Sequence, residues 1–127
     1  MNENELFDYL KASRFPGLIR SEGVYDSFDC LDSVAGYYIE LKCRHTHYPE
    51  LLIEKGKYDR LNFEAGYHGL DPWYINSTPE GIWGFDLTRV PEPAWEERLL
   101  PITTEFANAG KKIKVVGFLH TDYGLKL

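Results

Sequence analysis

Glu40 and Lys42 are the clearest sign of chemistry in this sequence, because they lie two residues apart in an otherwise apolar segment. Tyr38, Ile39 and Leu41 predict that this segment is a buried strand. Side chains two residues apart on a strand project from the same face of the sheet. Burying a carboxylate and an ammonium group is unfavourable unless each has a partner or a function. A carboxylate that can bind Mg²⁺, next to a cation that can contact water or phosphate, suits phosphodiester hydrolysis.

A second carboxylate for the same metal ion is available upstream, where Asp26, Asp29 and Asp32 precede the strand. Mg²⁺ prefers oxygen ligands and is often held by only one or two protein carboxylates, with water and phosphate completing the octahedron. Asp29 fits a position level with Glu40 on the neighbouring strand of a hairpin. Asp32 falls in the turn that follows, where we expect it to face solvent, and Asp26 stays open as an alternative ligand.

The acids and the lysine together resemble the motif of the PD-(D/E)xK nuclease superfamily, with Asp29 as the first acid and Glu40-x-Lys42 as the second part. Phe28 stands where the superfamily has proline. Residues 43–61 resemble the segment of small phage-type and resolvase-like members in which a helix directs a basic residue at the site, and the resemblance covers roughly residues 20–87. It implies a restriction-endonuclease-like fold: a single α/β domain over residues 1–127, with an αβββαβ core in which helices flank a central mixed β-sheet.

The resemblance also implies a role for each residue of the motif. Asp29, Glu40 and the backbone carbonyl of Leu41 would hold one or two Mg²⁺ ions, for which Mn²⁺ can substitute. Lys42 would orient the attacking water or stabilise the charge on the phosphate, and Lys57, on the following helix, would contact the scissile or an adjacent phosphate. The implied activity is metal-dependent endonucleolytic cleavage of DNA in phage genome processing, recombination or repair.

Other residues near the motif are candidates for contact with substrate or metal. The candidates for substrate contact are Arg44, His45, His47 and Lys55. Superfamily members often take a further metal ligand from the first helix, and Glu5 and Glu22 compete for that role. Small nucleases of this fold often dimerise to cut two strands, so we expect a symmetric homodimer.

Simpler interpretations of the same residues stay open. Glu40 and Lys42 would also fit an ion pair on an exposed sheet face, since such pairs are common and weak. Asp26, Asp29 and Asp32 would also fit turns, which favour aspartate. The rival function is that of a binding module in which the nuclease fold has lost catalysis and acts on nucleic acid or on a host protein.

The composition fits one folded domain without a membrane span. Hydrophobic residues make up 43% of the 127 residues and aromatic residues 15%, which is enough to fill one core. There is no long apolar run and no signal-peptide pattern, so we expect a cytoplasmic protein, phage-encoded in a bacterial host as the resemblance suggests. The net charge of −6 is unusual for a DNA-binding protein, but five Lys and Arg residues stand against four acids between residues 40 and 60.

Hydrophobic periodicity and turn signals predict the elements that position these residues. Helices are expected over Asn4–Ala12 and from Tyr48-Pro49 to Gly66. Strands are expected over Val24–Leu31, Tyr37–Cys43, Trp73–Asn76, Ile82–Leu87 and Ile113–Leu119. The second helix should direct Lys57 at the acids and turn Leu52 and Leu61 into the core. The last strand should lie at an edge, where Lys112 and Lys114 would discourage pairing with another chain.

Overall fold

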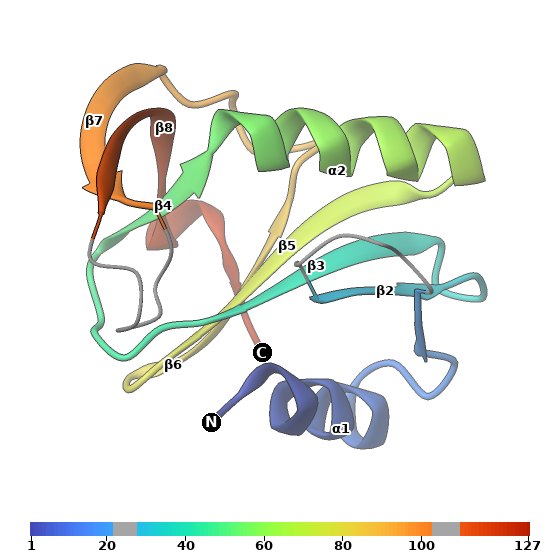
Figure 1. Cartoon of the computed structure of the whole chain (residues 1–127). Helices are drawn as coiled ribbons and strands as arrows, with labels where there is room; N and C mark the ends of the chain where they lie inside the picture. Colours follow the sequence, from blue (N-terminus) through green and yellow to red (C-terminus); the bar gives the residue numbers. More distant parts are fainter. Residues whose placement is uncertain (22–27, 103–109) are drawn as a thin grey trace.

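The structure, a computed structural model, describes residues 1–21, 28–102 and 110–127, which form a larger and a smaller β-sheet with two α-helices (Figure 1). The helices are α1 (Glu3–Ser13) and α2 (Lys55–His68). The larger sheet has the strand order β1 (Ile19–Arg20), β2 (Phe28–Asp32), β3 (Tyr37–Cys43), β5 (Asp71–Thr78), β6 (Gly81–Asp86) and β9 (Leu125–Lys126). The smaller sheet has the order β4 (Glu50–Glu54), β8 (Lys111–His120) and β7 (Glu96–Pro101), and a short 3₁₀ helix (Thr121–Tyr123) precedes β9.

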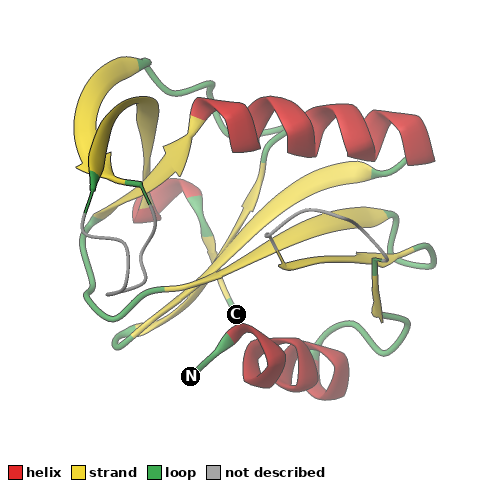
Figure 2. Ribbon diagram, in the orientation of Figure 1, coloured by secondary structure: helices red, strands yellow, loops and turns green. Residues whose placement is uncertain are grey.

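The larger sheet is mixed, because β3 pairs in parallel with β5 while its other neighbouring strands are antiparallel. Helix α1 covers one face of this sheet and α2 covers the other (Figure 2). The predicted hairpin between β2 and β3 is confirmed for the residues that the structure describes. Neither helix of the described residues is long and apolar enough to cross a membrane.

Helix α1 forms because its first turn is capped and one stripe is apolar. Asn2 and Glu5 form a capping box, in which each side chain accepts a hydrogen bond from the other residue's backbone N–H at 2.9 Å. Leu6 and Leu10, one turn apart, are fully buried against the face of the sheet that includes Ile39. This packing leaves the opposite face of the sheet to α2.

Helix α2 packs on that opposite face through Tyr58, Leu61 and Ala65. These side chains are spaced three and four residues apart, so they form one apolar stripe. The helix ends at Gly69, which has φ 68° and is therefore in the left-handed conformation that a helix C-cap favours. The stripe fixes which way the polar side chains beside it point.

The prediction that residues 50–54 belong to a helix is wrong, because they form β4 and the helix begins at Lys55. Leu51 and Ile53 are buried and alternate with half-buried Leu52, which is strand periodicity, and β4 pairs with β8 along its whole length. Leu52 therefore points away from the core side of β4, whereas Leu61 is buried as predicted.

Two further expectations are corrected. The strand predicted over Ile113–Leu119 is present as β8, but it lies in the middle of the smaller sheet, because β4 and β7 flank it. Asp32 is buried rather than exposed: its Oδ1 accepts hydrogen bonds at 3.0 Å from the backbone N–H groups of Val34 and Ala35 and so closes the β2–β3 turn.

Candidate active site

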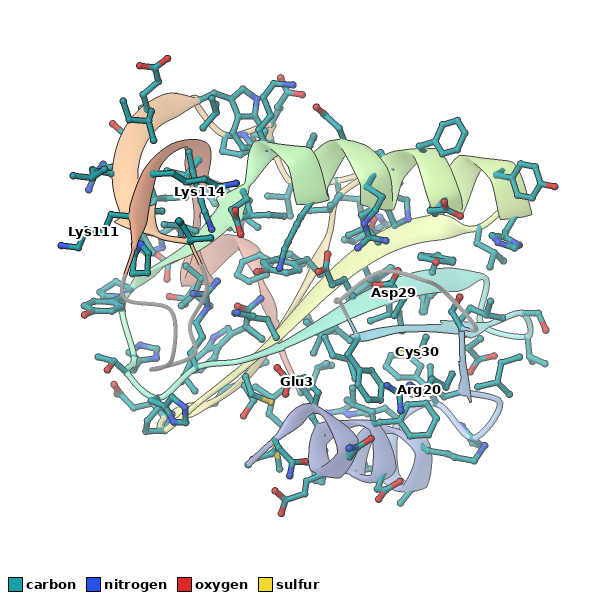
Figure 3. All side chains as sticks on the ribbon, viewed as in Figure 1. Glu3, Arg20, Asp29, Cys30, Lys111 and Lys114 are labelled. Atoms are coloured by element: carbon teal, nitrogen blue, oxygen red, sulfur yellow. The ribbon has the colours of Figure 1, made fainter. Side chains whose placement is uncertain are left out.

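The register of the β2–β3 hairpin places Asp29 directly opposite Glu40. Both side chains are buried, with exposures of 7% and 2%. Asp29 points toward α2, while its neighbour Cys30 points toward α1 (Figure 3). Of the aspartates weighed from the sequence, Asp29 is the one level with Glu40; Asp26 lies outside the described residues. Two carboxylates on adjacent strands therefore share one buried position under α2.

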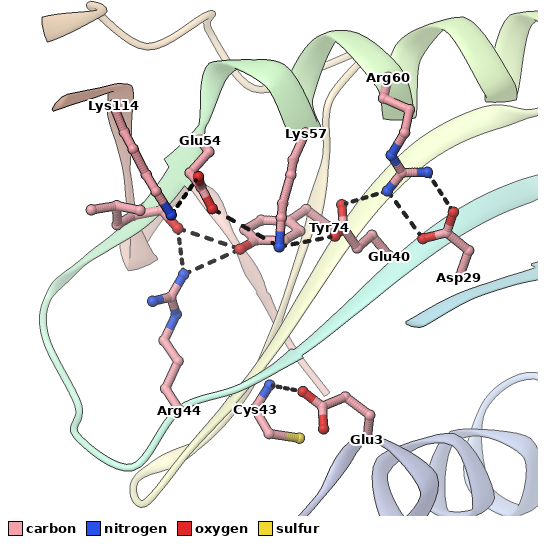
Figure 4. Close-up of polar contacts among 11 residues, drawn as sticks. Glu3, Asp29, Glu40, Cys43, Arg44, Glu54, Lys57, Arg60, Tyr74 and Lys114 are labelled. Atoms are coloured by element: carbon pink, nitrogen blue, oxygen red, sulfur yellow. Dashed lines mark hydrogen bonds and ion pairs between the residues drawn. The ribbon is translucent and has the colours of Figure 1, made fainter. Parts of the chain in front are cut away.

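Arg60 lies between these two carboxylates and was not singled out from the sequence (Figure 4). Its Nη1 and Nη2 donate hydrogen bonds to the two oxygens of Asp29, at 2.6 and 3.3 Å. Its Nη2 also lies 3.5 Å from Oε2 of Glu40. The hydroxyl of Tyr38 donates a further hydrogen bond to Asp29, at 3.2 Å. The carboxylate of Asp29 is thus held by a bidentate guanidinium and a phenol.

The negative charge of Glu40 has weaker partners than that of Asp29. Its Oε1 lies 3.9 Å from the ammonium of Lys57, and its buried Oε2 accepts no hydrogen bond from the described residues. Burial raises the pKa of Glu40 to about 7, although the charges of Lys57 and Arg60 act to lower it. The ionised form of this side chain would gain from further positive charge.

Lys42 does not pair with Glu40, so the interpretation as an exposed ion pair is wrong: Glu40 is buried, and its described ionic partners, Lys57 and Arg60, come from α2. Lys42 is half-buried and borders a cavity of about 180 Å³ that Lys57 and Lys114 also line. Burial lowers the pKa of Lys42, and the neighbouring charges of Lys57 and Arg44 lower it further. A cation with these neighbours favours an anionic ligand.

Glu54, the last residue of β4, links the smaller sheet to α2 at the wall of this cavity. One of its oxygens lies 3.1 Å from Nζ of Lys114 on β8, and the other lies 3.9 Å from Nζ of Lys57. The sequence places Lys114 in a basic cluster with Lys111 and Lys112 but does not connect it with the acids. The pairing of β4 with β8, which the sequence analysis does not predict, brings Lys114 to the cavity.

Arg44 is engaged in structural contacts next to the cavity. Its Nε donates to Oδ1 of Asn76 at 2.6 Å, and its Nη2 donates to the carbonyl of Leu52 and, at 3.1 Å, to the hydroxyl of Tyr74. Asn76 and Tyr74 are buried on β5. Arg44 therefore ties β3 to β4 and β5, and its guanidinium has little freedom to follow a phosphate.

Three other predicted substrate contacts lie away from the acids. His47 is hydrogen-bonded to Thr78 at 2.9 Å and packs on Trp83, at the β5–β6 end of the sheet. His45 is exposed and borders a hollow beside the first residues of α1. Lys55 pairs with Asp59 on the exposed side of α2, at 2.7 Å. The structure brings none of these three side chains to Asp29 and Glu40.

Among the described residues, the candidate for a further acid, Glu5, is also not at the site. Glu5 is used in the cap of α1, and Glu22 lies outside the described residues. Glu3 instead reaches β3, where its Oε1 accepts a hydrogen bond from the backbone N–H of Cys43 at 3.4 Å (Figure 4). Leu41 lies on β3 between β2 and β5, with its side chain buried on the α1 side.

The acid pair offers the oxygen ligands that a divalent cation prefers, but its oxygens are not arranged to surround a cation in this structure. Asp29 and Glu40 provide hard oxygen ligands, and one oxygen of Glu40 is buried without a hydrogen bond. However, within residues 1–21, 28–102 and 110–127, no three His, Cys, Asp or Glu side chains lie close enough together to hold a metal ion. Two carboxylates are enough for Mg²⁺ when water and phosphate complete its shell, provided that Arg60 leaves their oxygens.

A mixed sheet between two helices is the arrangement that a restriction-endonuclease-like fold predicts. Among solved structures the chain is similar to Hjc, a Holliday junction resolvase from the archaeal hyperthermophile Archaeoglobus fulgidus, with a TM-score of 0.61 and 16% identity. The similarity covers 98% of this chain and 92% of the resolvase chain. No protein-family model and no curated protein sequence matches the chain. The predicted fold class is thus confirmed: this is an α/β chain with the fold of a resolvase nuclease.

Proposed function

We propose that the protein is a metal-dependent endonuclease that cleaves DNA at the Asp29–Glu40 pair, with a four-way junction as its first substrate to test. The observation that carries this proposal is the pair itself: two buried carboxylates level with one another, beside a cavity lined by lysines, in a chain that shares its fold with a junction resolvase. Such a combination of hard ligands and cations matches what phosphodiester hydrolysis requires. The proposal includes membership of the PD-(D/E)xK superfamily.

In this proposal the side chains have distinct roles. Asp29 and Glu40 hold the metal ion, Mg²⁺ or Mn²⁺, together with the carbonyl of Leu41. When bound, the metal lowers the pKa of a water ligand and offsets charge on the phosphate. Lys42 orients the attacking water and stabilises the negative charge that grows on the phosphate, which needs only its positive charge. Lys57 contacts the scissile or an adjacent phosphate from α2.

The cavity gives the acidic protein a local surface that DNA can approach. Among the described residues, Lys42, Lys57 and Lys114 line it against one acid, Glu54, so the charge of this described lining is positive although the chain carries −6 overall. Attraction that is limited to a few phosphates releases few counterions, so it predicts weak binding with a shallow salt dependence unless a second copy adds contacts. We therefore retain the symmetric dimer as part of the proposal, together with an intracellular role in recombination, repair or phage genome processing.

The test is cleavage of a fluorescently labelled four-way junction, compared with linear duplex of the same sequence, in Mg²⁺, in Mn²⁺ and in excess chelator. The proposal expects cleavage by the wild type that chelator abolishes and that Glu40→Gln reduces by at least about 100-fold. Glu97→Gln, an exposed glutamate on β7, is the matched control and should cleave like the wild type. Undiminished cleavage by Glu40→Gln would remove the pair from the mechanism.

A second candidate function is favoured by the position of Arg60. A guanidinium bound to both oxygens of Asp29 neutralises that carboxylate without any metal ion, as expected if the fold has become a binding module. In that case the protein would shift a DNA junction in an electrophoretic assay but would leave it intact at every metal concentration. Binding with turnover supports the nuclease, and binding without turnover in the wild type and in Arg60 variants supports the module.

A further inference from the structure

We infer that Arg60 is an internal counter-ion of the acid pair that competes with a divalent cation for the same oxygens and so sets the metal affinity of the site. The inference rests on the proposed function only in taking Asp29 and Glu40 as the metal ligands. It assigns a role to a residue outside the Asp29, Glu40-x-Lys42 motif. That role can be measured without any nucleic acid.

The contact between Arg60 and the two acids is close and largely buried. The fork of Arg60 reaches both oxygens of Asp29, at 2.6 and 3.3 Å, and the same Nη2 lies 3.5 Å from Oε2 of Glu40 (Figure 4). The arginine side chain is only 17% exposed, and the two acids are less exposed still. One guanidinium thus contacts both carboxylates, the same two side chains that would hold a metal ion.

The charges explain why the two cations exclude each other. When Glu40 is ionised, Arg60 and Lys57 balance the charges of Asp29 and Glu40, so the group of four side chains is neutral before any metal arrives. A divalent ion that joined it would add two charges next to a guanidinium in a partly desolvated space, where like charges repel strongly. It would also need oxygens of Asp29 that now accept hydrogen bonds. Metal binding therefore requires the guanidinium to leave.

Arg60 has an accessible path out of the pair. It borders a groove of about 570 Å³ between α2 and β8, which Asp59 and Lys112 also line. Glu64 follows Arg60 by four residues on the same helix, a spacing at which oppositely charged side chains pair. Tyr58, Leu61 and Ala65 hold α2 on the sheet, so a rotation of the side chain suffices and the helix can stay in place.

The inference is tested by titrating Mn²⁺ into the protein without DNA and following free Mn²⁺ by its electron paramagnetic resonance signal. Arg60→Gln should bind Mn²⁺ at least tenfold more tightly than the wild type, and Asp29→Asn added to Arg60→Gln should abolish the gain. The matched control is Arg89→Gln, which removes an equal charge at an exposed ion pair with Asp86 and should leave the affinity unchanged. Circular dichroism establishes that each variant is folded.

Arg60→Lys provides a second route if Arg60→Gln does not fold. Lysine keeps the charge but contacts the carboxylates from a single point, so its Mn²⁺ affinity should exceed that of the wild type by several-fold. Equal or weaker Mn²⁺ binding in the folded Arg60 variants, or no binding in any of them, overturns the inference. Tighter Mn²⁺ binding by the variants without cleavage of any DNA supports the inference and removes the proposed nuclease function. Cleavage of DNA by the wild type with unchanged Mn²⁺ affinity in the variants supports the nuclease function and overturns the inference.

Discussion

Replacing Glu40 by glutamine should stabilise the metal-free protein at pH 8, although the change removes ion pairs with Lys57 and Arg60. The reason is that burial opposes ionisation of Glu40 more strongly than these two cations favour it, so that its pKa rises from 4.5 to about 7 on folding. Glutamine has nearly the same shape and is always neutral. It resembles the protonated glutamic acid, which is the form that burial favours.

The size of the effect follows from the shift in pKa. The unfolded chain releases the proton of Glu40 near pH 4.5, whereas the folded chain retains it up to about pH 7. Between these values the folded state binds more protons, so the free energy of unfolding of the wild type falls as pH rises and the loss is complete above pH 7. At about 1.36 kcal/mol per unit of pKa, the full loss is roughly 3 kcal/mol.

The assay is urea denaturation of wild type and Glu40→Gln in chelator at a series of pH values between 4.5 and 8.5. The two proteins should be similar near pH 4.5, and the variant should become the more stable by a difference that grows to roughly 3 kcal/mol at pH 8. Glu97→Gln serves as the control and should show no such pH-dependent gain. A difference that stays constant with pH, or a variant less stable than the wild type at pH 8, would refute the reasoning.

Three other substitutions test the same site. Arg60→Ala should destabilise the metal-free protein by roughly 3 kcal/mol in denaturant titration, because it leaves the buried Asp29 without its main partner; an effect as small as that of a surface substitution, within about 0.5 kcal/mol, would contradict the contact. Lys57→Ala should weaken junction binding or turnover and retain Mn²⁺ binding; unchanged binding and turnover would exclude its phosphate contact. Glu54→Gln should tighten junction binding and increase its salt dependence, because Lys57 and Lys114 lose their shared carboxylate; weaker binding would exclude the cavity as a DNA contact.

The hairpin that holds the acids could be predicted because its signals are local. Alternating apolar residues around Glu40 indicate a buried strand, and the short turn before it fixes antiparallel pairing. Once the register was assumed, Asp29 was the acid that fell level with Glu40, as the structure has it. The direction in which Lys57 points also followed from its place on the helix after the strand, and the structure puts it 3.9 Å from Glu40.

The role of Arg60 is not indicated by the nuclease motif, although its spacing from Lys57 places it on the same helix face. It lies three residues after Lys57, so the two side chains share one face of α2 and reach the same part of the sheet. The motif of metal ligands directs attention to acids and one lysine, and a second cation inside the pair is not part of that motif. The signal in the sequence that points to Arg60 is its position as a charged residue on the sheet-facing side of the helix.

The smaller sheet could not be derived locally, because its strands owe their conformation to partners far along the chain. Glu50–Glu54 follows a Tyr-Pro pair that is also typical of a helix start, and only pairing with β8 decides for a strand. Strand β7, Glu96–Pro101, is mostly exposed and lacks the alternation that marks a half-buried strand. Without the β4–β8 and β7–β8 pairings, the sequence does not indicate that Lys114 reaches the cavity.

The central claim, that this site hydrolyses DNA, is tested most directly by the single-turnover rate of junction cleavage at saturating Mg²⁺ for wild type and Lys42→Met. Lys42 contributes no metal ligand, and its removal takes positive charge away from the metal position, so Mg²⁺ should still saturate the variant. Lys42→Met should cleave at a rate at least about 100-fold lower than that of the wild type, while Lys126→Met, at an exposed position on β9, should cleave normally. Equal rates in wild type and Lys42→Met would contradict it.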